Sequence, residues 1–320
     1  MKELKNRLEY IDLIKGFSIL LVVLGHIYDF ENNIKIWIYS FHMPLFFIIS
    51  GFFVNKDIKL GRLLSKKFKS LIIPYISFGI GIMLLMYFSI NLRNELNEYI
   101  MFFMIGVGRD ALWFLPALFI VEILFNIIDR IESKSSKYIM LVILFLIGLY
   151  GKNYYENMIL IVIYRAFIGL GFYSIGNYIY DYVTNCNLSY LSLVIIFATN
   201  MILALNNSYI DLWGLYFNDK FIYVFCSIVG SLSVIIFFKK ISNRIKYKKI
   251  LMFFGRNTLI IMSTQQIIIN YINIVTKSQY YSTKEGLIVL LIVMIIELPI
   301  IYIINNYLPF MIGKLKKQKI

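Results

Sequence analysis

Charged residues are scarce in this chain of 320 residues. Asp, Glu, Lys and Arg make up only 16% of it, whereas hydrophobic residues make up 60% and the mean hydropathy is +0.74. A soluble domain of this length carries considerably more charge on its surface. The composition therefore excludes a soluble protein and indicates an integral membrane protein.

Long apolar runs dominate what remains. Several approach the roughly 20 residues that a spanning helix needs, and the alternating ten-residue pattern of an outer-membrane barrel is missing. No internal repeat and no soluble domain stand out, so we expect residues 1–320 to form one membrane domain with an all-α, polytopic helix bundle. Ten spans are predicted, at residues 11–29, 34–54, 70–90, 111–129, 138–151, 158–180, 188–205, 221–238, 250–276 and 286–308.

Cysteines and clustered metal ligands are scarce as well. Cys186 and Cys226 fall in a short loop and in an apolar span, a placement that disfavours a disulfide framework. A Cys-x-x-Cys pair, a His-Glu-x-x-His run and closely spaced carboxylates are all missing. The sequence thus predicts no metal cofactor.

The 32 lysines and arginines are distributed unevenly between alternate connecting segments. If the N-terminus is cytoplasmic, most of them fall on the cytoplasmic side, including two dense segments at 56–69 and 239–249. The positive-inside rule then predicts that both termini are cytoplasmic. Because basic segments face anionic lipid headgroups in any plasma membrane, the net charge of +14 does not require nucleic acid as a partner.

The chain has only two histidines, His26 and His42, and both lie inside apolar runs. An imidazole in lipid is costly, so it indicates chemistry or a polar partner. Histidine is also the side chain best suited to transfer protons near neutral pH. On the predicted topology both histidines lie in the outer half of the membrane on neighbouring antiparallel helices, and we expect them to face one cavity. The alternative is a structural role for each, satisfied by a nearby polar group.

Other polar residues accompany the histidines in the first two spans. Asp12 and Lys15 are three residues apart, which predicts an ion pair on one helical face. Pro44 interrupts the backbone hydrogen bonds beside His42 and leaves carbonyl groups to bind a ligand or water. Ser50 and Gly51 permit either close helix packing or entry of a cofactor.

Taken together, the segments YIDLIKGFSILLVVLGHI and FHMPLFFIISGFF closely resemble the membrane-bound acyltransferase 3 family. Four later segments are similar to that family too: SKKFKSLIIPY, ALWFLPALF, YRAFIGLGFYSIG and FGRNTLIIMSTQQ. The resemblance therefore touches most of the chain, and the combination is far more specific than any single segment.

The resemblance implies that an acyl group, often acetyl, moves from cytoplasmic acyl-CoA to a hydroxyl of a cell-surface sugar or its lipid-linked precursor. The family's helix-one histidine corresponds to His26, the expected general base, and its Asp-x-x-Arg/Lys-Gly element falls on Asp12, Lys15 and Gly16. We add His42 to this expected catalytic set as a residue that shapes the pocket or donates a hydrogen bond. The family's Ser-Gly element falls on Ser50 and Gly51. The full acyl-CoA-binding set expected is Ser50, Gly51, Lys66, Lys67, Lys69 and Arg165, and Arg165, Asn257 and His42 are candidate donors to the oxyanion.

The chain departs from the family pattern at two places. Many members carry arginines before the proline of the third span, whereas this chain has Lys66, Lys67 and Lys69 before Pro74, which gives point charges without bidentate geometry. Many members carry a histidine where this chain has Gln265, which cannot titrate.

Two alternatives remain. A transporter or flippase for a sugar or polymer would also place polar residues in a membrane bundle, although it needs no base at His26. A catalytically inactive partner in a glycan-assembly complex would leave His26 and Lys15 dispensable. We expect a bacterial plasma membrane location; the sequence does not decide between a monomer, a homo-oligomer and a complex with glycan-assembly partners.

Overall fold

The computed structural model describes residues 2–90, 92–151, 158–242, 244–246, 248–278 and 281–314. Its regular elements are all helical, which confirms the predicted all-α bundle. Within these described ranges, eight helical segments are long and apolar enough to span a membrane. Two shorter helices, α8 and α10, of 17 residues each, lie at the other two predicted positions. The helices are α1 (Lys2–Ile27), α2 (Asn33–Tyr39), α3 (His42–Gly51), α4 (Leu60–Lys67), η1 (Phe68–Ile72), α5 (Ile73–Phe88), η2 (Arg93–Glu95), α6 (Leu96–Met104), η3 (Asp110–Trp113), α7 (Phe114–Ile128), α8 (Lys134–Tyr150), α9 (Met158–Asn185), α10 (Tyr190–Asn206), α11 (Lys220–Ile241), α12 (Lys248–Arg256), α13 (Thr258–Thr276), α14 (Thr283–Tyr307) and η4 (Pro309–Ile312).

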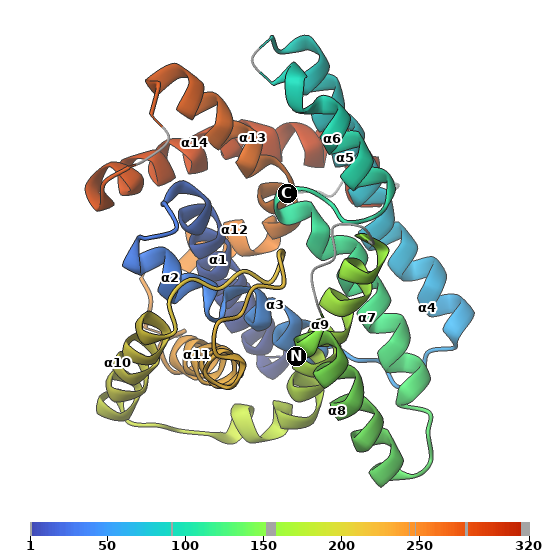
Figure 1. Cartoon of the computed structure of the whole chain (residues 1–320). Helices are drawn as coiled ribbons and strands as arrows, with labels where there is room; N and C mark the ends of the chain where they lie inside the picture. Colours follow the sequence, from blue (N-terminus) through green and yellow to red (C-terminus); the bar gives the residue numbers. More distant parts are fainter. Residues whose placement is uncertain are drawn as a thin grey trace.

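Helix α1 lies in the middle of the bundle. It packs against α2, α3, α11, α12, α13 and α14 (Figure 1). Helix α9 packs on α3, α7 and α8 pack on α9, and α10 lies against α11. The polar residues of α1 and α3 are therefore surrounded by protein rather than by lipid, which lowers the cost of placing them at membrane depth.

Two glycines allow α1 and α12 to pack closely. A Cβ atom on Gly16 would overlap the carbonyl oxygen of Leu251, and one on Gly255 would overlap the carbonyl oxygen of Asp12. Small residues at such contacts let two backbones approach in a membrane. The Gly16 that follows Lys15 therefore has a packing role.

The predicted span 34–54 is broken between α2 and α3, at Ser40 and Phe41. Pro44 lies in the first turn of α3, where its missing N–H is not needed. The carbonyl group that Pro44 leaves without a helical partner, that of Ser40, is not left for a ligand, contrary to our expectation. Ser227 of α11 donates to the Ser40 carbonyl at 2.8 Å, and Ser231 donates to the Phe41 carbonyl at 3.4 Å.

The predicted span 250–276 is also divided, at Asn257 between α12 and α13. A second unpredicted feature is the π-helix η1, which interrupts the helix of 60–88 just before Pro74. The segment between the third and fourth predicted spans contributes the short helix α6. These features bend helices that hydropathy describes as continuous.

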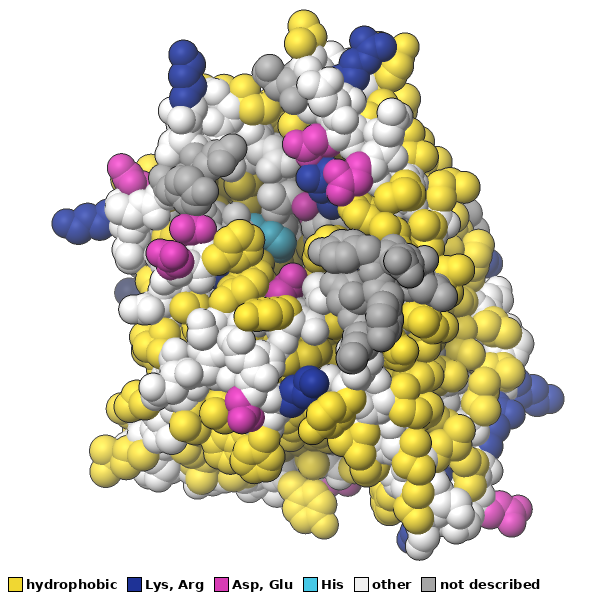
Figure 2. Space-filling view, in the orientation of Figure 1, with side chains coloured by type: hydrophobic (Ala, Val, Ile, Leu, Met, Phe, Trp, Pro, Cys, Tyr) yellow, Lys and Arg dark blue, Asp and Glu magenta, His cyan; other side chains and the backbone are white. Residues whose placement is uncertain are grey.

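Segments predicted to share one side of the membrane meet at one end of the bundle. The connections after α1, before η3, between α10 and α11, and the outer part of α13 all contribute to one hollow. Figure 2 shows this face, where a histidine side chain is visible in the hollow among acidic and basic side chains. Segments that the charge pattern assigns to one side of the membrane therefore lie at one end of the bundle.

Candidate active site

Both histidines line one cavity of about 390 Å³, which we call the histidine cavity. Its wall is built by α1, α2, α3, η3, α13 and the loop between α10 and α11. This confirms that His26 and His42 face a common space. The other polar side chains in the wall are Lys35, Tyr39, Arg109, Asp110, Tyr209, Asp211 and Gln266, and the aromatic ones without polar tips are Phe30 and Phe46, joined by Trp113 and Trp213.

A hydrogen bond fixes the ring of His42. Its Nδ1 lies 2.9 Å from the carbonyl oxygen of Ile38, which at the helix break also accepts from the N–H of Phe41 at 3.2 Å. A carbonyl oxygen can only accept, so Nδ1 carries the proton and Nε2 of the neutral ring is the acceptor. His42 is buried, and its ring lies 4.8 Å from that of Tyr39 between centroids.

His26 has no hydrogen bond to another described residue, and its ring approaches Tyr39 edge-on at 6.4 Å between centroids. It lines the histidine cavity and also a neighbouring hollow of about 700 Å³, which we call the vestibule. Both ring nitrogens of His26 are thus available to molecules in these spaces, at the point where the two meet.

Lys35 places a cation in the same wall, a role that the sequence did not reveal. Its Nζ donates to the carbonyl of Tyr28 at 2.9 Å and lies 4.2 Å from the ring centre of Phe30, and the side chain is buried. An ammonium group has three donors, so two of them remain for a ligand in the cavity. The only sequence signal was a lysine at the start of an apolar run.

The loop between α10 and α11 closes one side of the histidine cavity. The Asp211 carboxylate accepts from the N–H groups of Trp213 at 2.9 Å and Gly214 at 3.1 Å, which shapes a tight turn. Burial raises the pKa of Asp211 above its usual range, and the two N–H donors oppose that rise. The indole N–H of Trp213 donates to the Gly108 carbonyl at 3.0 Å and joins this loop to the one before η3.

Arg165 ties the same two loops together. Its guanidinium donates to the Trp213 carbonyl and to the Val107 carbonyl, each at 2.7 Å, and stacks against Trp113 and Trp213. The side chain is only 2% exposed and does not line the histidine cavity. Arg165 therefore joins these two loops away from the cavity, and its predicted acyl-CoA-binding role stays a prediction.

Asp12 and Lys15 lie at the opposite end of α1. Eleven residues separate Lys15 from His26, which is about 16 Å at 1.5 Å per residue. The predicted ion pair between Asp12 and Lys15 is wrong for the described side chains, because Asp12 binds Nε of Arg256 at 2.7 Å instead. Neither residue lines the histidine cavity, and their membership of the catalytic set stays a prediction.

The comparisons with known proteins can now be set against this geometry. The model of an acyltransferase domain matches residues 8–306. The chain belongs to the acyltransferase 3 family. Curated proteins and solved structures gave no match.

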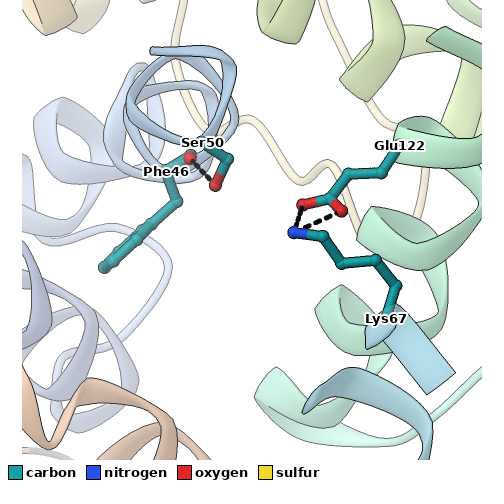
Figure 3. A network of polar contacts seen from close by, with 4 residues as sticks. All are labelled: Phe46, Ser50, Lys67 and Glu122. Atoms are coloured by element: carbon teal, nitrogen blue, oxygen red, sulfur yellow. Dashed lines mark hydrogen bonds and ion pairs between the residues drawn. The ribbon is translucent and has the colours of Figure 1, made fainter. Parts of the chain in front are cut away.

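The Ser50-Gly51 element of this acyltransferase 3 protein is a packing element. A Cβ on Gly51 would overlap the carbonyl oxygen of Tyr173 in α9, so there is no room for a cofactor at that position. Ser50 donates to the Phe46 carbonyl at 2.8 Å (Figure 3). The contact at Gly51 therefore favours close helix packing over entry of a cofactor as the role of this element.

The lysines before Pro74 differ from one another in their surroundings. Lys67 forms an ion pair with the buried Glu122 at 2.5 Å, which joins α4 to α7 (Figure 3). Lys66 and Lys67 line a cavity of about 310 Å³, which we call the Lys67 cavity, whereas Lys69 lies exposed on η1 and does not line it. A cation held by a buried carboxylate is less available to a phosphate, so only Lys66 of the predicted trio remains free to meet a ligand there.

Gln265 of the acyltransferase is fully buried, and neither atom of its amide has a hydrogen-bond partner within the described part of the chain. The next residue, Gln266, lines both the histidine cavity and the vestibule. The amide that reaches the site from this helix is therefore that of Gln266.

The described residues contain no group of three or more His, Cys, Asp or Glu side chains that could hold a metal ion.

Proposed function

We propose that this acyltransferase transfers an acyl group, expected to be acetyl, from cytoplasmic acyl-CoA to a hydroxyl of a sugar. The acceptor would be a cell-surface polysaccharide or its lipid-linked precursor. The observation that carries the proposal is the histidine cavity, where two imidazoles meet aromatic and acidic side chains at one end of the bundle. A cavity lined mostly by cations, suited to an anionic donor, lies at the other end of α1.

The wall of the histidine cavity suits a polyhydroxyl acceptor. Trp113, Trp213 and Tyr209 offer flat apolar faces with polar edges, against which a sugar ring can stack. Asp110 and Asp211 accept hydrogen bonds from hydroxyl groups, and the amide of Gln266 both donates and accepts. A few polar groups in an aromatic pocket are the usual means of orienting a small ligand.

His26 is the proposed general base. It takes the proton from the acceptor hydroxyl while that oxygen attacks the thioester carbonyl, and the C–S bond then breaks as the tetrahedral intermediate collapses. The leaving thiolate receives the proton back from His26, so protons balance and CoA leaves as a thiol. His26 supports this role because it lies where the histidine cavity and the vestibule meet, with no ring nitrogen bound to a described residue.

Lys35 is the best-placed donor to the developing oxyanion. Of the candidates expected from the sequence, Arg165 is bound to two carbonyl groups, and Asn257 lies at the opposite end of the bundle. His42 presents a lone pair rather than a proton at Nε2. The ammonium of Lys35 faces the cavity with donors to spare and supplies the positive charge that an oxyanion requires.

One observation favours His42 as base instead. The hydrogen bond to Ile38 orients its ring and leaves Nε2 as an acceptor, the arrangement in which a second group positions a catalytic base. His42 lines the histidine cavity but not the vestibule. We assign His42 a positioning role, and mutation of each histidine tests which of the two is the base.

Proteoliposomes test the proposed function against transport. The purified protein is reconstituted, acetyl-CoA labelled on the acetyl group is supplied on the side of the basic segments, and candidate glycans are supplied on the other side. Label bound covalently to a glycan hydroxyl, as an ester cleaved by mild base, is the expected result. Movement of unmodified glycan across the membrane without labelling would favour the transporter and contradict acyl transfer.

A further inference from the structure

The histidine cavity and the vestibule share part of their walls, and we call this shared part the neck. Its residues come from α1, the loop after it, α2, the start of η3 with the residue before it, and α13. A molecule that occupies both spaces passes the neck and meets the proposed base there. The neck residues are His26, Phe30, Lys35, Arg109, Asp110 and Gln266.

Arg109 brings an unused hydrogen-bond donor to the neck. Its Nη2 pairs with Glu95 at 2.7 Å, and this ion pair holds the guanidinium group in place. Its Nη1 is buried and has no hydrogen-bond partner among the described residues. Because a buried donor without a partner is costly, such a group marks a place where a ligand or a water binds.

Gln266 brings an unused acceptor to the same neck. Its Nε2 donates to Oδ1 of Asn270 at 3.1 Å, which orients the amide. Its Oε1 is buried and accepts from no described residue. Helix α13 packs against η3, and Arg109 directly precedes η3. The unused donor and the unused acceptor therefore come from neighbouring elements that line the same two spaces.

The loop that carries Arg109 has a fixed backbone. Gly108 adopts a φ of 59°, and a Cβ there would lie 2.6 Å from the backbone nitrogen of Trp113, so glycine is required. The Gly108 carbonyl accepts from the indole of Trp213 at 3.0 Å. Asp110 has a φ of 57°, a conformation that Asp adopts more readily than most residues. The loop thus places Arg109 in the neck before a ligand binds.

The two unused groups together favour hydroxyl groups over an ion. A hydroxyl both donates and accepts, so neighbouring hydroxyls of a sugar satisfy Nη1 of Arg109 and Oε1 of Gln266 at once. An anion has no proton for Oε1, and an ammonium group has no acceptor for Nη1. The ion pair with Glu95 also offsets the charge of Arg109. The neck is therefore suited to an uncharged sugar unit.

The side chains beyond the neck differ between the two spaces. Trp113, Trp213 and Tyr209 line the histidine cavity but not the vestibule, so the stacking faces proposed for the reacting sugar lie on one side of the neck only. The vestibule instead carries amides, such as Asn270 and Asn273, and it measures about 700 Å³. It therefore offers polar space for further sugar units.

We propose that Arg109 and Gln266 bind hydroxyl groups of the sugar unit next to the one that is acylated. The reacting unit lies in the histidine cavity, the glycosidic linkage passes His26 in the neck, and the next unit begins the vestibule. The inference rests on the proposed function and deepens it, because it makes Arg109 and Gln266 specificity residues for an acceptor of two or more units rather than a free monosaccharide.

Acceptors of different length test this assignment on the purified full-length chain. Cell-surface polysaccharide from the strain that encodes the protein is de-esterified with mild base, partially hydrolysed with acid, and separated into monosaccharide, disaccharide and tetrasaccharide fractions. Each fraction is offered with labelled acetyl-CoA, and kcat/KM for the fraction is measured. We expect the wild type to use the disaccharide and the tetrasaccharide at least about tenfold better than the monosaccharide, because only they reach both unused groups.

Two variants remove the unused groups one at a time. Arg109→Lys keeps a cation beside Glu95 but lacks the Nη1 donor, and Gln266→Met keeps the length of the side chain but lacks the amide. We expect each to lower kcat/KM for the disaccharide by about tenfold and to leave the monosaccharide within about twofold of the wild type. Arg93→Lys is the matched control, because Arg93 is exposed and lines neither space.

A structural role would give a different result. A space of about 20 Å³ beside Arg109 and Tyr99 has room for one water, and Nη1 could bind only that water. The variants would then lose activity equally with both acceptors, which would overturn the inference. Because both acceptors are measured on one preparation, the ratio of the two kcat/KM values does not depend on how much of the variant is folded.

The wild type alone separates this inference from the proposed function. Equal use of the monosaccharide and the longer fractions would overturn the inference and leave acyl transfer intact. Failure to label any fraction would reject the proposed function, and this inference with it.

Discussion

The two histidines differ in what their ring nitrogens contact. Nδ1 of His42 is bound to the Ile38 carbonyl, whereas His26 has no hydrogen bond to another described residue. The His42→Asn variant separates the two functions of that ring, because the Asn amide can donate to Ile38 but cannot act as a base. We expect label transfer to stay within about tenfold of the wild type, since the proposed base is His26.

A far larger loss in His42→Asn, with normal thermal unfolding, would give the base role to His42. His42→Ala is the companion variant. It also removes the bond to the buried Ile38 carbonyl, which keeps the N–H of Phe41, so we expect it to lower the free energy of unfolding by about 0.5–1.5 kcal/mol.

Arg165 acts on the site through the two loops that it joins. Lysine in its place keeps the charge but loses the planar fork that reaches two carbonyl groups and the stacking on two tryptophans. We expect Arg165→Lys to lower the free energy of unfolding by about 1–3 kcal/mol and to raise KM for the acceptor while CoA affinity is unchanged. The exposed Arg93→Lys is the matched control, and an unaltered acceptor KM would contradict a positioning role.

At the level of residues, the sequence located the histidines but not their partners. Two histidines in apolar runs of neighbouring helices were enough to predict one shared cavity. The bond from His42 to Ile38 depends on a helix break, and the contacts of Arg165 depend on loops that are distant in sequence. The role of Lys35 in the cavity wall was not predicted, because a lysine at the start of an apolar run is ordinarily part of a connecting segment.

Among the helices, the contact between α1 and α12 holds the end of α1 that carries Asp12 and Lys15. Gly16 and Gly255 allow the two backbones to touch, and α12 also supplies Arg256 to Asp12. A methyl group on Gly16 would overlap the Leu251 carbonyl, which neither backbone can avoid without shifting. We therefore expect Gly16→Ala to lower the free energy of unfolding by about 1–3 kcal/mol.

Gly81→Ala is the matched control, because a Cβ at Gly81 in α5 meets no atom within 4 Å. Alanine should leave that helix as stable or stabilise it by up to about 1 kcal/mol. Equal unfolding of the two variants in a denaturant series would contradict the close contact.

Helix positions were more predictable than helix continuity. Hydropathy placed all ten apolar segments, because each must be long enough to bury its backbone polar groups. It did not predict the breaks at Ser40 and Asn257, since the residues on both sides are equally apolar. Side chains of other helices bind polar groups at these breaks: Ser227 donates to the Ser40 carbonyl, and Asn305 donates to the Asn257 side chain. The hydropathy of a single segment cannot predict such contacts.

For the whole molecule, the account requires the histidine cavity to open on the side of the membrane opposite the basic segments. Single cysteines at Lys277, beside the vestibule, and at Lys134, in a basic segment, test this in a chain whose Cys186 and Cys226 are replaced by serine. We expect a membrane-impermeant maleimide to label the 277 position in intact cells and the 134 position only after permeabilisation. The reverse pattern would contradict the orientation inferred from charge.

The central claim is that His26 takes the proton from the acceptor hydroxyl, and single-turnover label transfer by the His26→Asn variant tests it most directly. The protein is preloaded with labelled acetyl-CoA, and the rate of ester formation is followed over a range of pH. The account predicts a fall of about 100- to 10,000-fold, CoA affinity within about twofold of the wild type, and loss of the rise in rate with pH that a neutral imidazole gives the wild type. A variant that transfers label at the wild-type rate, with the same dependence on pH, would contradict the account.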